Sequence, residues 1–367
     1  MTELAAPFAP DWVSPPGDSI LDIIEERDWT QAELAQRLGY TTKHINQLIK
    51  GKVPLTEDAA IRLERVVGST VGFWLAREAK YRERCARLDA AQRFTEWTNW
   101  LDQLPIKELM IANCIEKRRI DAKSKPSIVE SCLRFFGVAS PDDWQNHYGQ
   151  MQALFRRSRE EQSDIGAISS WLRMGEQEAE KLDGPKYDRT RFEAALTEIR
   201  KLTTYDPKEF QPRLQTLFYE AGVAFVLVPA IPKAHVSGVA RWLNAHRPLI
   251  QLSLYGKTND KFWFSLFHEA AHILLHAKEK KSVYLDDPNK HSSNSDEERE
   301  ANAWARNFLI PEHLSSALSH LRTKSAVHEF AQKIGIHPGI VVGRLQHDGL
   351  IDPSWMNDLK ISFRFKK

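Results

Sequence analysis

Two histidines and a glutamate lie close together at His268, Glu269 and His272, in the pattern H-E-x-x-H. An apolar run surrounds them and favours a helix, on which residues four apart share one face. Both imidazoles can therefore reach one tetrahedral zinc ion. Glu269 is rotated by about 100° from His268, which places its carboxylate where it can take a proton from water activated by the metal. The pattern predicts a zinc site with the chemistry of a metallopeptidase.

A catalytic zinc ion needs a third protein ligand, and three glutamates of a downstream acidic segment are candidates. They are Glu297, Glu298 and Glu300. On the helix expected from 297 to 309, Glu298 and Asn302 lie one turn apart along one side of the buried stripe. Glu300 falls at the opposite margin and Glu297 points into the stripe, so geometry alone leaves the choice open. Asn302 is a candidate for supporting the site or its substrate.

A core helix that happens to hold two histidines is the alternative. Burying two histidines and a glutamate without partners would be costly, and the acidic helix supplies the partner that a metal site needs. His276, one turn beyond His272, could support a metal ligand, but we expect a cap or a solvent-facing role. Arg241 is a weaker candidate for binding a substrate backbone or an oxyanion. Still weaker candidates are His235, His246 and His291.

A second functional pattern lies near the N-terminus. Thr30 and Glu33 have the spacing of a capping box, in which each side chain accepts from the other's backbone N–H, so a helix should begin at Gln31. Gly39 suits the left-handed end of that helix, and Thr41 or Thr42 can cap a following helix through Ile49. The segment therefore predicts two helices joined by a tight turn.

The second of these helices has an outward face suited to DNA. Residues 40 to 56 contain no acidic side chain. Amides and hydroxyls can read base edges, while lysines and a helix N-terminus hold phosphates. The alternative is an ordinary helical hairpin with a solvated polar face. The predicted DNA-binding residues are Gln31, Thr41, Thr42, Lys43, Asn46, Gln47, Lys50 and Lys52.

The rest of the chain suggests several domains, because 367 residues exceed what one hydrophobic core usually serves. We expect an all-α N-terminal part, a helical middle region and an α+β C-terminal domain. Strands are predicted at 222–229 and 249–254, a helix at 260–276 and a polar loop at 278–296, with Ser295 and Glu298 capping the next helix. The expected divisions are a flexible leader (1–16), a DNA-binding domain (17–80), a linker or interaction region (81–205), a metallopeptidase domain (206–355) and a tail (356–367).

Composition sets further limits. The formal charge of +2 is nearly balanced, so contact with nucleic acid must come from a local patch. Three widely spaced cysteines suit a reducing compartment and argue against a thiolate metal site. No signal peptide or membrane-spanning run is evident, so we expect a cytoplasmic protein without a membrane partner.

The N-terminal residues resemble the Cro/C1-type helix-turn-helix, and their continuation from Leu55 to Tyr81 is similar to the antitoxin variety named HigA. The resemblance covers about 20–81. It implies sequence-specific binding to operator DNA, commonly as a homodimer, and makes a toxin a candidate partner.

The C-terminal half resembles the ImmA/IrrE metallo-endopeptidases, through HEAAHILLH and the segment from Glu298 to Pro311. The resemblance spans about 210–351 and includes SGVARWL and LIQLSL. It implies that the glutamate four residues before the asparagine, Glu298, is the third zinc ligand. Ala271 stands where many members have glycine, a small departure. Since similar members cleave transcriptional repressors, it also implies a repressor-like protein substrate.

Residues 325 to 351 again have a helix, turn, helix pattern. A second DNA-reading unit is conceivable, but packing against the peptidase core is the expected role because this segment accompanies the family's catalytic domain. The strand at 249–254 is a candidate for pairing with an extended substrate.

Three functions follow from these expectations. The chain is a DNA-binding regulator with a peptidase that cleaves a repressor, or a HigA-like antitoxin and repressor whose zinc site is structural or silent. The third is a non-catalytic scaffold in which the middle helices bind a partner.

Overall fold

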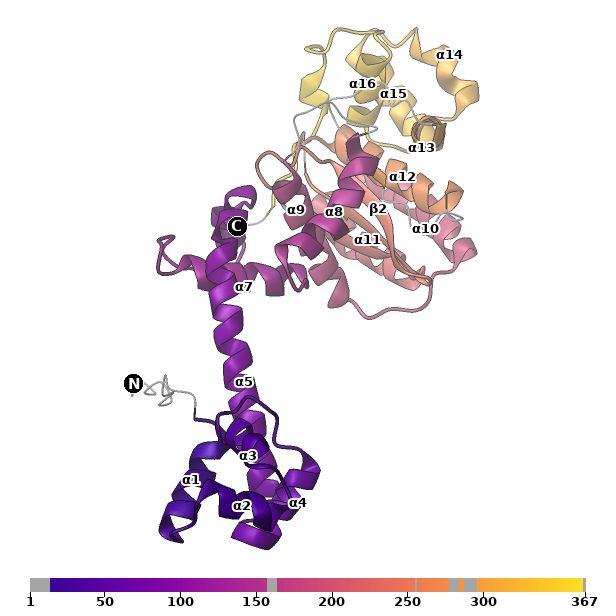
Figure 1. The fold of residues 1–367 in the computed structure, drawn as a ribbon. Coiled ribbons are helices and arrows are strands. Elements are labelled where there is room, and N and C mark those ends of the chain that lie inside the picture. Colours follow the sequence, from indigo (N-terminus) through magenta and orange to yellow (C-terminus); the bar gives the residue numbers. More distant parts are fainter. Residues whose placement is uncertain (1–13, 157–163, 255, 277–283, 287–295, 366–367) are drawn as a thin grey trace, which may run out of the picture. The chain divides into compact units, whose positions relative to one another are not determined.

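The computed structural model describes residues 14–156, 164–254, 256–276, 284–286 and 296–365 (Figure 1). The chain folds into two compact units, Met1–Trp97 and Thr98–Lys367. Among the described residues, no helix has the length and apolar character required to cross a bilayer.

The N-terminal unit is all-helical, and threonine caps define its elements. The side chains of Thr30, Thr41, Thr56 and Thr70 each accept from the backbone N–H three residues later, at the start of α2, α3, α4 and α5. The elements are α1 (Pro16–Glu26), α2 (Gln31–Leu38), α3 (Thr42–Ile49), α4 (Glu57–Val67) and α5 (Val71–Glu96).

The turn between α2 and α3 follows the sequence expectation with one exception. Gly39 ends α2 with φ +70°, and Thr41 caps α3 by accepting from the His44 N–H at 3.1 Å. Thr30 accepts from the Glu33 N–H at 3.2 Å, but the Glu33 carboxylate pairs with Arg37 at 2.7 Å. Only one of the two hydrogen bonds of the capping box therefore forms, because Arg37, four residues after Glu33, pairs with the carboxylate.

Helix α5 continues beyond residue 80, where the sequence suggested a domain boundary, to Glu96. Its first half belongs to the N-terminal helical core, since Trp74 is fully buried in the same core as Leu48 and Ile49. Tyr81 packs so tightly against Gly51 that a side chain at Gly51 would collide with its ring. Gly51 also has φ +64°, so the residues after α3 are held by α5.

The C-terminal unit begins with helices that share an aromatic cluster. The rings of Trp100, Phe136, Trp144 and Tyr148 lie within 5.5 to 6.5 Å of one another in successive contacts. The helices are η1 (Trp97–Gln103), α6 (Ile106–Ile111), α7 (Lys125–Phe136) and α8 (Pro141–Arg156). Both α7 and α8 contact α9 (Ile165–Glu180).

A mixed four-stranded sheet forms the centre of the unit, with the order β1-β3-β2-β4. β1 pairs parallel with β3, and β2 pairs antiparallel with both β3 and β4. The strands are β1 (Ala224–Leu227), β2 (Gly238–Asn244), β3 (Arg247–Leu252) and β4 (Tyr284–Asp286). β3 is thus paired along both sides, which rules out the expectation that it pairs with a substrate. β4 lies within the segment that we expected to be a loop.

Alternation along the strands gives the sheet two buried faces. Val239 and Leu249 pack with Trp171 of α9, whereas Ala240 and Ile250 join the core on the other side. That second core contains α10 (Arg189–Lys201), η2 (Leu202–Thr204), α11 (Pro207–Glu220) and α12 (Asn259–Leu275). Helices α9 and α10 therefore belong to the cores that cover this sheet, although the sequence suggested a linker or interaction region there.

The remaining helices pack around α12. They are α13 (Asp296–Leu309), η4 (Glu312–Leu314), α14 (Ser315–Leu318), α15 (Lys324–Ile334), α16 (Pro338–His347) and η5 (Asn357–Leu359). α16 contacts α12, and its Gly339 and Gly343 leave room for Asn259 and Asp260. A recognition helix would present its side chains to solvent, so the buried α16 has the packing role that we expected for this segment.

The expected C-terminal tail is also part of the core. Phe363 is 8% exposed and packs against Phe210 and Phe262, with ring centroids 5.6 and 5.4 Å away. The backbone of Asn259 donates to the Ile361 carbonyl at 2.8 Å. The end of the chain therefore anchors the start of α12.

Candidate metal centre

Helix α12 is buried on nearly all sides because its run from Phe262 to Leu274 is almost entirely apolar. It lies between the sheet, α13 and α16, all of which it contacts. Its ionisable side chains in this run are His268, Glu269 and His272, which are 1%, 0% and 1% exposed. Three ionisable side chains buried in an apolar helix require specific partners.

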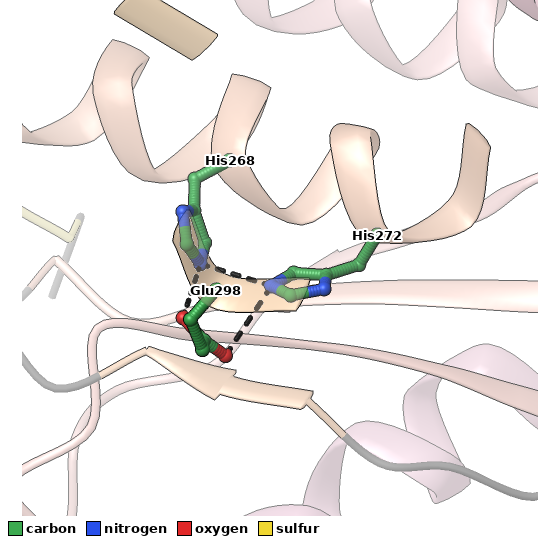
Figure 2. A group of neighbouring side chains, drawn as sticks. All are labelled: His268, His272 and Glu298. Carbon is green, nitrogen blue, oxygen red and sulfur yellow. Dashed lines mark hydrogen bonds and ion pairs between the residues drawn. The ribbon is translucent and has the colours of Figure 1, made fainter. Parts of the chain in front are cut away.

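Glu298 of α13 meets the two histidines, as Figure 2 shows. Its Oε2 lies 3.3 Å from His268 Nε2 and its Oε1 lies 3.4 Å from His272 Nε2. The two Nε2 atoms are 3.1 Å apart. Two histidine nitrogens and the two oxygens of one carboxylate, from two helices, therefore converge on one point.

The spacing of these atoms fits zinc. Nitrogen and oxygen ligands that lie about 2.0–2.1 Å from a tetrahedral ion are about 3.3 Å from one another. The observed separations of 3.1, 3.3 and 3.4 Å agree with this value. Two imidazoles and one carboxylate are also a donor set that leaves a fourth position of catalytic zinc open.

Further side chains orient the two rings from behind. Metal binding through Nε2 requires the ring proton on Nδ1. His268 Nδ1 then donates to Asn302 Oδ1 at 3.1 Å, and His272 Nδ1 donates to His276 Nδ1 at 3.1 Å. His276 in turn donates through Nε2 to Glu300 at 3.2 Å. One hydrogen-bond pattern thus presents both Nε2 lone pairs to the same point.

The electrostatic environment favours the protonation states in which His272 and Glu298 can bind a metal ion. Burial lowers the pKa of His272 to about 4, so the ring is neutral and offers a lone pair at neutral pH. Burial alone would raise the pKa of Glu298, but its contacts with the rings of His268 and His272 hold it well below its usual range. Glu298 is therefore a carboxylate.

The Glu269 carboxylate lies against the start of β2. A Cβ added to Gly238 would be 2.7 Å from Glu269 Oε1 and 2.6 Å from Leu252 Cδ2. Only glycine leaves this space, so the strand and the helix approach each other closely at the carboxylate. Glu269 is held by backbone packing on the side of the sheet.

The structure brings some of the remaining candidates into the site and not others. Glu298 and Asn302 both meet α12, and Glu300 reaches His276. Arg241 instead faces α9, where it is 4% exposed, pairs with Glu176 at 2.5 Å and donates to the Leu172 carbonyl at 2.7 Å. These contacts join β2 to α9 and stabilise the fold, so the buried guanidinium is not placed to bind a substrate. Ser295 and His291 lie outside the described residues.

His276 combines the two roles that were weighed for it, a cap and a support for His272. It is the C-cap residue of α12, with its backbone N–H bonded to the His272 carbonyl, and its ring also contacts His272. The signal was present as a third histidine four residues after His272, on the same face of the helix. The matching carboxylate, Glu300, came from a different helix.

The predicted DNA-binding residues gather around α3. Thr41, Thr42, Lys43, Lys50 and Lys52 are exposed, while Gln31, Asn46 and Gln47 are partly exposed. Asn46 Nδ2 donates to Gln31 Oε1 at 3.4 Å, which joins the face of α3 to the first residue of α2. Ile45, Leu48 and Ile49 anchor the opposite face of α3 in the core.

Comparisons with known families agree with this division. Residues 20–74 match the helix-turn-helix model HTH_3, and residues 226–346 match Peptidase_M78, described as the IrrE N-terminal-like domain. None of the curated proteins compared with the chain matches it. The chain thus combines a region that matches a helix-turn-helix family with a region that matches a metallopeptidase family. Its two parts are a Cro/C1-type helix-turn-helix and an IrrE-like domain, as the resemblances predicted.

Proposed function

We propose that this protein is a DNA-binding transcriptional regulator whose zinc-dependent endopeptidase domain cleaves a repressor-like protein. The observation that carries the peptidase part is the convergence of His268, His272 and Glu298 within 3.1 to 3.4 Å, next to the buried Glu269. The match to an IrrE-like domain supports the same chemistry.

The site residues have distinct roles in this proposal. His268, His272 and Glu298 would hold zinc, and bound zinc would acidify a water molecule and polarise the scissile carbonyl. Glu269 takes a proton from the attacking water and passes it to the leaving amine. Asn302 and His276 hold the rings of His268 and His272 in orientation.

The sheet offers an edge for the substrate. β4 pairs with β2 on one side, and among the described residues no strand pairs with its other side. An extended peptide can add to such an edge through main-chain hydrogen bonds. We therefore assign to β4 the role that the sequence suggested for β3.

The peptidase proposal is tested with Glu269→Gln in a strain that co-expresses a candidate repressor from the same operon. The variant should keep its zinc content and lose cleavage, because glutamine fills the same volume but accepts no proton. Wild-type cleavage that continues in the variant would refute the proposed base. A wild-type protein that holds zinc and cleaves no candidate would favour the structural zinc site of an antitoxin-like repressor.

The DNA-binding proposal concerns Asn46 and Gln47 on the outward face of α3. Binding to the chain's own upstream region should weaken when both become alanine, by about 1–3 kcal/mol for each lost base contact. Lys50→Ala should weaken binding to all DNA sequences alike and reduce the salt dependence of that binding. Unaltered operator affinity of the double variant in a gel-shift titration would refute the assignment of α3.

A further inference from the structure

A small pocket lies at the N-terminal end of α12, beside the metal centre. It is shallow: about 260 Å³ of space lies over its lining, much of it open to solvent, and the enclosed part has room for about one water molecule. Its polar lining is supplied by Ser237, Ser253, Lys257, Thr258, Lys261 and Ser265. Neither the metal centre nor the proposed proton transfer uses these side chains.

The pocket lies on the face of α12 that also carries Glu269. Lys261 and Ser265 precede Glu269 by eight and four residues on α12, so the three side chains share one face of the helix. On the sheet side, Ser237 immediately precedes Gly238, which packs against the Glu269 carboxylate. A peptide bound at the metal centre can therefore place a neighbouring side chain in this pocket.

The lining is positively charged. Lys257 and Lys261 are exposed at its mouth, and the part of the chain that the structure describes contains no ion pair at either ammonium group. The nearby carboxylate of Asp260 pairs with Lys360 at 2.7 Å and lies against Gly343 of α16. The local acid is thus already neutralised, while both lysines remain available.

The pocket also contains hydrogen-bond donors. Thr258 Oγ1 is buried and has no hydrogen-bond partner within the described ranges. Thr258 is the N-cap residue of the 17-residue helix α12, whose dipole places partial positive charge at this end. A carboxylate would accept from the Thr258 hydroxyl while pairing with the lysines.

We propose that this pocket is a specificity subsite that binds an acidic side chain of the substrate next to the scissile bond. The inference rests on the proposed peptidase function and adds the class of peptide that it cleaves. Glutamate and aspartate supply the required anion, and a neutral isostere such as glutamine lacks it. Because the lysines are exposed, the preference arises from screened charge pairs and is moderate in size.

The test uses peptide hydroxamates, whose hydroxamate group binds zinc directly. They are compared in pairs, and the two members of a pair differ only in having Glu or Gln as the first or second side chain after the hydroxamate. Calorimetry on the zinc-loaded full-length protein gives the affinity ratio of each pair. One pair should show about three- to tenfold tighter binding of the Glu compound, with a ratio that decreases as salt is added. The ratio should fall to about one in Lys257→Met/Lys261→Met.

Two further variants separate charge from general damage. Lys208→Met removes an exposed lysine of α11 and should leave the ratio unchanged. Lys261→Glu should reverse the preference when the compared compounds carry Lys and Gln. Zinc retention with equal binding of every Glu and Gln compound would overturn the subsite alone. Failure of the wild-type protein to retain zinc or bind any hydroxamate would overturn the subsite and the proposed function together.

Discussion

His268 is tied to α13 by a hydrogen bond between its Nδ1 and Asn302 Oδ1, 3.1 Å apart. Glu298 lies one turn earlier on the same helix. α13 therefore supplies one proposed metal ligand and also orients the ring of another. The relationship explains why the two helices must dock in one register for the site to exist.

Removing this hydrogen bond should weaken metal binding. Asn302→Leu leaves the Nδ1 proton of His268 without an acceptor, and loss of such a partner typically costs 10- to 100-fold in metal affinity. Competition with a chelating dye measures the change. Asn307→Leu, on an exposed position of α13, is the matched control and should bind zinc as the wild type does. Equal affinities for both variants would show that Asn302 does not position the ring.

Gly238 provides a way to move the proposed base without altering a ligand. In Gly238→Ala the new methyl would collide with Glu269 Oε1 at 2.7 Å and Leu252 Cδ2 at 2.6 Å. We expect at least a tenfold loss of cleavage with zinc content preserved, because about 1 Å of misplacement can cost far more. Gly72→Ala meets its nearest neighbour at 3.8 Å and should be silent. Normal cleavage by Gly238→Ala would contradict a fixed Glu269.

Arg200 stabilises the helices around the site from the region that looked like a linker. Its guanidinium donates to the carbonyls of Phe308 and Leu309 at the end of α13 and of Ile334 at the end of α15. Burial lowers its pKa, and no carboxylate among the described residues forms an ion pair with it. Its donors therefore cap two helices at once.

Arg200→Met should lower the free energy of unfolding by about 2–4 kcal/mol, because helix-end carbonyls lose charged donors. Chemical denaturation of the zinc-loaded protein measures this. Arg191→Met replaces an exposed arginine of the same helix and should change stability little. A similar small effect of both substitutions would exclude the capping role.

His337 should make the C-terminal unit sensitive to acid. Its Nδ1 accepts from the Gly339 N–H at 3.0 Å and lies 2.8 Å from Asn259 Nδ2, so both neighbours are donors. Burial lowers the pKa of His337 below its ordinary value of 6.5, with His328 adding to the effect. Between the lowered pKa and 6.5, the unfolded chain binds more protons at this residue than the folded chain does. The contribution of His337 to the free energy of unfolding is therefore full above pH 6.5 and is lost as the pH falls below 6.5.

His337→Asn keeps a side chain that caps helices and removes the titration. The variant should lose less unfolding free energy than the wild type when the pH is lowered from 6.5. Denaturation curves collected across this range provide the comparison. An identical pH dependence of the two proteins would exclude His337 as a source of acid sensitivity.

Local signals in the sequence predicted much of this structure. The caps at Thr30 and Thr41 and the glycine at Gly39 define α2 and α3, because these rules depend on neighbouring residues. The H-E-x-x-H spacing places His268 and His272 on one helical face for the same reason. The choice of Glu298 as the third ligand required the family resemblance, since helical geometry left three glutamates as candidates.

Other features depend on contacts between distant residues. Arg241 looked available for substrate, but its partner Glu176 lies 65 residues away on α9. The pairing of β3 on both sides and the docking of Phe363 likewise arise from tertiary packing. Short β4 had no apolar alternation in a polar segment, so periodicity could not reveal it.

The most direct test of the account is the zinc content of the purified wild-type chain beside Glu298→Ala and Glu297→Ala, measured by mass spectrometry of the metal. We predict one zinc ion per chain for the wild type and for Glu297→Ala, and little or none after dialysis for Glu298→Ala. Full zinc retention by Glu298→Ala, or its loss from Glu297→Ala alone, would contradict the convergence of His268, His272 and Glu298 on one ion.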